Sequence, residues 1–153
     1  MNRKALLALI LCILLAGCLT GCAGNHNVGG SYVGTLPQSG AVAIAEDATA
    51  QLSALYPPGH TSIRLVAPKQ SDAFSQALET SLRQKGFTLS PNGTVTMSYV
   101  LDELRLAKPP AWYLQLRIAD HSHNKTLARS YTASGQPAAG FSSLATGGGD
   151  DHE

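Results

Sequence analysis

The sequence has no excess of charge of either sign, no long hydrophobic run and no cysteine after residue 22. Its 11 Lys and Arg residues face 10 Asp and Glu residues, so overall charge gives no reason to expect a nucleic-acid or acidic partner. The longest apolar run, residues 5–15, is shorter than the ~20 residues of a membrane-spanning helix. A chain of 153 residues holds one ordinary domain. These observations exclude multidomain enzymes, coiled coils and polytopic membrane proteins.

Recognisable catalytic motifs are also missing after residue 22, since no G-x-S-x-G, P-loop, dinucleotide glycine pattern, H-E-x-x-H or C-x-x-C occurs there. His121 and His123 have the spacing of a metal pair on a strand, but a polar hairpin turn explains them better, because no third ligand is near. Asp102 and Glu103 could form an acid pair, yet adjacent strand residues face opposite sides. We therefore expect no enzymatic activity, no cofactor, no metal site and no small-molecule substrate.

Two further features are compatible with binding, although the fold explains them better. Trp112 and Tyr113 follow Pro109-Pro110 and could form an aromatic lip, but a core Trp beside a partly exposed Tyr is the simpler interpretation. Residues 61–129 contain nine basic and five acidic side chains. These charges alternate along the chain and predict a solvated surface with no direct nucleic-acid binding.

The first residues have the organisation of a secretory signal peptide. A basic start, Asn2-Arg3-Lys4, precedes the apolar run at residues 5–15, and small residues follow it. The strings Leu15-Ala16-Gly17-Cys18 and Leu19-Thr20-Gly21-Cys22 both resemble the bacterial lipobox, in which the cysteine sulfur receives a diacylglycerol and becomes the new N-terminus. The sequence predicts a lipoprotein whose signal peptide covers residues 1–17 or 1–21.

Either Cys18 or Cys22 can be the lipidated residue. Cys18 is preferred because its box is more typical and its apolar segment is long enough, whereas cleavage before Cys22 would leave no free thiol in an oxidising compartment. A bacterial lipoprotein carries at least two acyl chains, which suffice for stable anchoring. The next residue, Leu19 or Ala23, is not the aspartate of inner-membrane retention. We expect lipid anchoring in the cell outer membrane, with the domain facing the periplasm.

The remaining chain divides into three parts by composition. Residues 18–40 form the lipidated N-terminus and a Gly-, Asn- and Ser-rich segment typical of a flexible tether. Residues 134–153 resemble it and predict a flexible Gly/Asp-rich tail. The folded domain is expected over residues 41–133.

The periodicity of residues 41–133 predicts two helices and five strands. Apolar residues at 44, 48, 52 and 55 share one face of a helix that ends at Pro57-Pro58. A second helix begins at Ser71 as N-cap and ends at Gly86. Alternating or short apolar patterns predict strands at residues 62–67, 87–89, 95–101, 112–118 and 125–133. The order indicates an α+β domain in which two helices pack on one face of a mainly antiparallel sheet of about five strands.

Several strings within residues 41–133 resemble the TrbH family of conjugal transfer lipoproteins: Leu55-Tyr56-Pro57-Pro58, Asp72-Ala73-Phe74 leading to Gly86-Phe87, and Tyr99-Val100-Leu101-Asp102. The resemblance implies a non-enzymatic tether or scaffold in a mating-pair-formation (type IV secretion) apparatus, with other transfer subunits as partners. It transfers no catalytic residue. The alternative is a generic periplasm-facing envelope lipoprotein that binds a small ligand, glycan or lipid, or assists another outer-membrane assembly.

Overall fold

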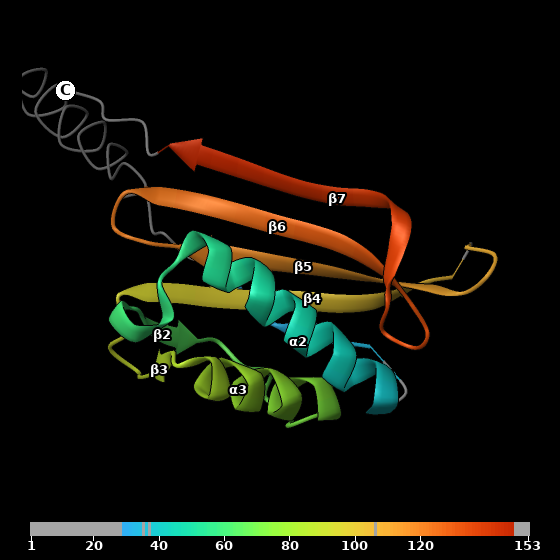
Figure 1. Cartoon of the computed structure of the whole chain (residues 1–153), viewed down its shortest axis with the longest axis horizontal. Helices are drawn as coiled ribbons and strands as arrows, with labels where there is room; N and C mark the ends of the chain where they lie inside the picture. Colours follow the sequence, from blue (N-terminus) through green and yellow to red (C-terminus); the bar gives the residue numbers. More distant parts are fainter. Residues whose placement is uncertain (1–28, 35, 37, 106, 149–153) are drawn as a thin grey trace, which may run out of the picture.

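The protein is an α+β domain in which two helices lie on the same face of a mixed, mostly antiparallel sheet (Figure 1). The structure, a computed structural model, describes residues 29–34, 36, 38–105 and 107–148. The expected fold class is confirmed. In chain order the elements are β1 (Tyr32–Val33), α2 (Gln38–Leu55), the short 3-10 helix η1 (Pro58–His60), β2 (Ser62–Leu65), α3 (Ala73–Lys85), β3 (Thr88–Leu89), β4 (Val95–Leu104), β5 (Ala111–Ala119), β6 (His123–Thr132) and β7 (Pro137–Gly148).

The sheet has seven strands in the order β3-β2-β4-β5-β6-β7, with β1 paired to β4. The pairs among β1, β2, β3 and β4 are parallel, whereas β4 to β7 form an antiparallel meander. A helix connects β1 to β2, which both pair with β4, and another connects the parallel neighbours β2 and β3. The parallel half of the sheet therefore carries the helices in its connections, and the antiparallel half has only short ones.

Both helices begin and end where local chemistry allows. Asp72 caps α3, because its side chain accepts a hydrogen bond from the Ser75 amide at 2.9 Å. This corrects the expectation of Ser71 as N-cap, since a carboxylate one residue later satisfies the same free amides. Gly86 ends the helix in the left-handed conformation, with φ 99°. The other helix, α2, ends at Leu55 just before Pro57.

The core fills the space between the helices and the sheet. Alternate residues of the central strands point to this side, and they are buried: Val95, Met97, Tyr99 and Leu101 of β4, and Trp112, Leu114, Leu116 and Ile118 of β5. Ile44 and Leu52 of α2 and Phe74, Leu78 and Leu82 of α3 face them. The Tyr99 hydroxyl is satisfied within this core by donating to Ser75 Oγ at 2.8 Å. The alternating apolar residues of the strands and the apolar stripes of the helices, both predicted from the sequence, thus pack against each other.

The two flanks of the domain differ from the sequence expectation. The part of 18–40 that is described contains β1, and α2 begins at Gln38. Residues 137–148, expected within a flexible tail over 134–153, form β7 and pair with β6 along its length. The sheet therefore has seven strands and not about five. The physical reason is that an added strand is held by backbone hydrogen bonds, which need no apolar alternation in the sequence.

Two strands share one side of β4. Residues 95–97 of β4 pair with β2, and residues 100–101 pair with β1, both in parallel, so that β1 and β2 lie end to end. Ser31 joins them, because its Oγ accepts from the Tyr99 amide at 2.9 Å and donates to the Val66 carbonyl. The Gly34 amide continues the ladder to the Leu101 carbonyl at 2.7 Å. A side chain therefore completes the hydrogen bonding where the two strands meet.

Replacing Leu116 by alanine tests the core that this arrangement creates. The side chain is 2% exposed, and truncating a buried leucine leaves a cavity as well as losing apolar burial, so Leu116→Ala should lower the free energy of unfolding by about 2–5 kcal/mol. Leu104→Ala is the matched control, since Leu104 at the end of β4 is 40% exposed. Chemical denaturation should show a much smaller loss for the control. Equal losses in the two variants would contradict the assigned core.

Candidate functional site

In the part of the chain that the structure describes, the residues singled out from the sequence are not gathered in one place. Cys18 and Cys22 lie outside the described residues. His121 is exposed in the β5–β6 turn, and His123 begins β6 with its Nδ1 3.8 Å from Asp120 Oδ1. Within the described ranges, no group of three or more His, Cys, Asp or Glu side chains could hold a metal ion. The structure thus places His121 in the turn and His123 at the start of β6.

Each acidic candidate is the cross-strand partner of an aromatic candidate, but the two acidic residues are kept apart. In β4, Asp102 pairs with Tyr113 and Glu103 pairs with Trp112, so the two carboxylates lie on opposite faces of the sheet. Trp112 is 5% exposed and belongs to the core. The indole is therefore unavailable to an aromatic binding lip.

A first polar cluster joins the middle of α2 to β6, and we call it the Asp47 cluster. Arg129 Nη1 donates to both Asp47 oxygens, at 3.0 and 3.1 Å. The Tyr131 hydroxyl and Gln51 Nε2 each donate to Asp47 Oδ2 at 2.7 Å. Burial, with the Asp47 carboxylate beside it, raises the pKa of Tyr131 far above its ordinary value. The phenol therefore stays protonated, and the carboxylate is held by three side chains.

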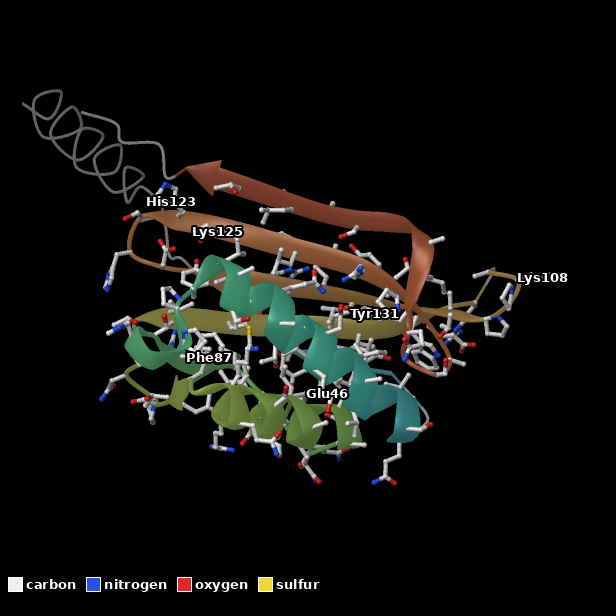
Figure 2. The ribbon with its side chains drawn as sticks, viewed as in Figure 1. Glu46, Phe87, Lys108, His123, Lys125 and Tyr131 are labelled. Atoms are coloured by element: carbon white, nitrogen blue, oxygen red, sulfur yellow. The ribbon has the colours of Figure 1, made fainter. Side chains whose placement is uncertain are left out.

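A second polar cluster, the Tyr56 cluster, links β6 to the chain just after α2. Figure 2 shows its Lys125 toward one end of β6 and Tyr131 of the Asp47 cluster toward the other. The Tyr56 hydroxyl donates to Asp120 Oδ2 at 2.8 Å, and Lys125 Nζ donates to both groups at 3.0 Å. Asp120 Oδ1 accepts from the backbone amides of Ser122 and His123, which shapes the β5–β6 turn. Lys125 Nζ also lies 4.9 Å from the centre of the Tyr56 ring.

The pKa values of the Tyr56 cluster favour its charged pair at neutral pH. Burial opposes ionisation of Asp120, but the hydrogen bonds from two amides, Tyr56 and Lys125 together hold the pKa of this carboxyl far below its usual range. The hydrogen bond to Tyr56 raises the pKa of Lys125. Burial raises the pKa of the Tyr56 phenol. Since both carboxylates of these clusters are already engaged by donors, the geometry suits fastening α2 to β6 and offers no poised general base.

The two outer strands of the sheet differ sharply. At one end β3 has only two residues. At the other end β7 has twelve, and among the described residues no strand pairs with its outer side. Residues 142–147 are all exposed, and the sequence of β7 contains no charged residue. A long, uncharged outer strand presents unpaired amides and carbonyls, which is a template for another strand. This edge is the candidate docking site.

The sequence model of the conjugal transfer protein TrbH matches residues 26–148. The chain belongs to the TrbH family. The match extends beyond the residues 41–133 over which the resemblance was noted, and its last residue is also the last of β7. The outer strand is therefore part of the region that the TrbH family shares. A search of curated proteins and a search of solved structures gave no match.

Sequence reasoning missed both the polar clusters and the outer strand of this TrbH-family domain. Asp47 and Arg129 are 82 residues apart in the chain, so no local spacing pointed to their contact. For β7 one signal was present: Ser134-Gly135 can turn the chain back after a predicted strand, and Gly135 has φ 82°. The uncharged segment that follows this turn is β7.

Asp120→Asn tests whether the Tyr56 cluster contributes an ionic interaction. At pH 7 the variant should lose about 1–3 kcal/mol of unfolding free energy, because a neutral amide replaces a carboxylate that accepts several charge-assisted hydrogen bonds. The folded-state pKa is depressed, so the contribution is fully present above the unfolded-state pKa of about 3.9 and disappears as pH falls through the folded value. Urea melts from pH 7 down to the acid limit should show the two proteins converging.

Glu103→Gln serves as the control for this measurement. Glu103 is exposed near the end of β4, so its substitution should change stability by no more than about 0.5 kcal/mol at pH 7. A constant difference between Asp120→Asn and the unmodified protein at all pH values would show that the effect is one of packing and not of charge.

Proposed function

We propose that the protein is a lipid-anchored outer-membrane component of the conjugal transfer apparatus, which holds other transfer subunits and catalyses no reaction. Membership of the TrbH family carries this proposal, because it places the chain among conjugal transfer proteins. The lipid would provide position, and the α+β domain would provide the docking surface. The available edge of β7, described above, is the part of the domain best suited to docking.

The lipoboxes support the anchor. Both Cys18 and Cys22 follow a Leu-small-Gly string after an apolar segment, and either can receive the acyl chains. No helix in the described ranges has the length and hydropathy to cross a membrane. Two or more acyl chains would suffice to hold the domain at a bilayer surface.

The electrostatics of the domain support a protein partner over nucleic acid. Of the nine basic residues between positions 61 and 129, Arg83, Lys125 and Arg129 are each in a salt bridge. Sustained binding to DNA would need a concentrated basic surface that releases counterions. The engaged carboxylates of the Asp47 and Tyr56 clusters likewise support a scaffold over an enzyme.

Replacing both Cys18 and Cys22 by serine should abolish acylation, because serine lacks the thiol that attacks the lipid donor. The protein should then remain an unprocessed precursor or leave the outer-membrane fraction. Labelled palmitate and membrane fractionation measure these outcomes. Recovery of the double variant in an acylated and normally cleaved form would contradict lipid anchoring through these cysteines. Loss of acylation in Cys22→Ser alone would identify Cys22 and overturn the preference for Cys18.

Deleting the gene should strongly reduce plasmid transfer or pilus assembly, while nicking of the transfer origin and the transfer ATPases remain intact. Mating assays with complementing plasmids measure this. The double variant His121→Ala, His123→Ala should complement the deletion, because both side chains are exposed, one in the β5–β6 turn and one at the start of β6, whereas the Cys18→Ser, Cys22→Ser variant should not. Undiminished mating by the deletion strain would remove the transfer role and favour a generic envelope lipoprotein.

A further inference from the structure

We propose that two copies of this chain pair through the outer edge of β7, antiparallel across a two-fold axis, so that their sheets become continuous. The inference goes beyond the proposed function, since it depends neither on the lipid anchor nor on a role in transfer. It depends on the contrast between the two edges of the sheet and on the residues that β7 presents.

The edge of β7 lacks the features by which proteins usually prevent strand pairing. Such features are short edge strands, lysines, prolines and bulges. The opposite edge is protected in this way, because β3 has two residues. In β7 the only proline is Pro137, its first residue, and the irregular register with β6 also lies at that end. Residues 142–148 pair with β6 without interruption and remain open on the outer side.

The composition of β7 fits pairing with itself. In antiparallel pairing across a two-fold axis, each residue near the axis meets itself or a close neighbour from the other copy, so any charge there would face a like charge. The strand Pro137–Gly148 contains no Asp, Glu, Lys or Arg. Between residues 142 and 147 every side chain except Leu144 is small. Neither repulsion nor bulk therefore opposes a second β7.

Leu144 gives the pairing an apolar contact. It lies directly across from Leu127 of β6, which puts it on the helix-covered face, yet it is 53% exposed whereas Leu127 is 8% exposed. Leu144 also lies near the middle of the uninterrupted stretch of β7. A two-fold axis close to this residue would place the two Leu144 side chains side by side and extend the apolar strip of Leu116 and Leu127 into the second copy.

The geometry favours a second copy over a strand from an unrelated protein. Specific recognition of a foreign strand relies on pockets or charges along the edge that read its side chains, and the exposed residues 142–147 offer neither. A two-fold axis perpendicular to the sheet keeps the helices of both copies on one face. Both helices lie away from β7 (Figure 1), so neither helix obstructs the approach of a second copy to this edge.

Charge variants at Leu144 test the proposal on the full chain, purified in detergent. Analytical ultracentrifugation should detect a dimer of the unmodified protein. Leu144→Lys and Leu144→Glu should each raise the dimer Kd about tenfold or more, because each puts like charges together at the axis and removes the leucine contact. An equimolar mixture of the two variants should recover dimers, since opposite charges then meet. Leu104→Lys, at an exposed leucine of β4, should leave the Kd unchanged.

Three results would overturn self-pairing. The first is a protein that stays monomeric at about 100 μM, a concentration far above the Kd of a specific dimer. The others are a dimer Kd that Leu144→Lys does not change and a mixture of the two charge variants that stays monomeric. Thermal melts verify that the variants fold, and Thr146→Lys with Thr146→Glu provide a second pair. In cells, a photo-crosslinking residue at Ser143 should yield an adduct of twice the chain mass. An adduct only with a different protein would overturn self-pairing and assign the edge to that partner.

Discussion

The packing of α2 across the sheet is the interaction on which the rest of the domain depends. On one side its apolar stripe, with Ile44 and Leu52, closes the core above β4 and β5. On its other side it reaches β6 through the Asp47 and Tyr56 clusters, whose ion-paired side chains are only partly exposed. Long side chains can make such contacts and still keep their polar ends in contact with water.

This arrangement explains why the polar groups are paired so completely. A carboxylate removed from water without partners would be costly, whereas one that accepts several hydrogen bonds is not. Asp47 accepts hydrogen bonds from a side chain of α2 and from side chains of β6. Asp120 accepts from Tyr56, just after α2, and from the backbone where β6 begins. The two clusters fix the rotation and tilt of the helix at two separated points. The strand β6, to which β7 pairs, is therefore connected to the helix layer by polar side chains as well as by the core.

The elements that could be predicted from the sequence are those in which side-chain pattern decides structure. The stripe of α3, its glycine terminus and the alternation in β4 and β5 all arise because one face must be buried. The strands β1 and β7 could not be predicted in this way, because β1 has only two residues and the small residues and glycines of β7 give no alternation. In both, the backbone of a neighbouring strand holds the chain. The polar clusters could not be predicted either, since Asp47 and Arg129 are 82 residues apart in the chain and meet only in the tertiary structure. The lipobox cysteines stay a prediction.

The end-to-end placement of β1 and β2 on β4 has a mechanical consequence. The strand β1 is attached to β4 at both of its ends, because Ser31 just before it accepts from the Tyr99 amide and Gly34 just after it donates to the Leu101 carbonyl. A pulling force on the chain before β1 would load these hydrogen bonds along the strand direction, in shear. In that geometry the bonds must break together and not one after another. The force would pass into β4, which is separated from the outer strand β7 by β5 and β6. The site of loading and the outer edge of β7 are thus separated by two strands of the sheet.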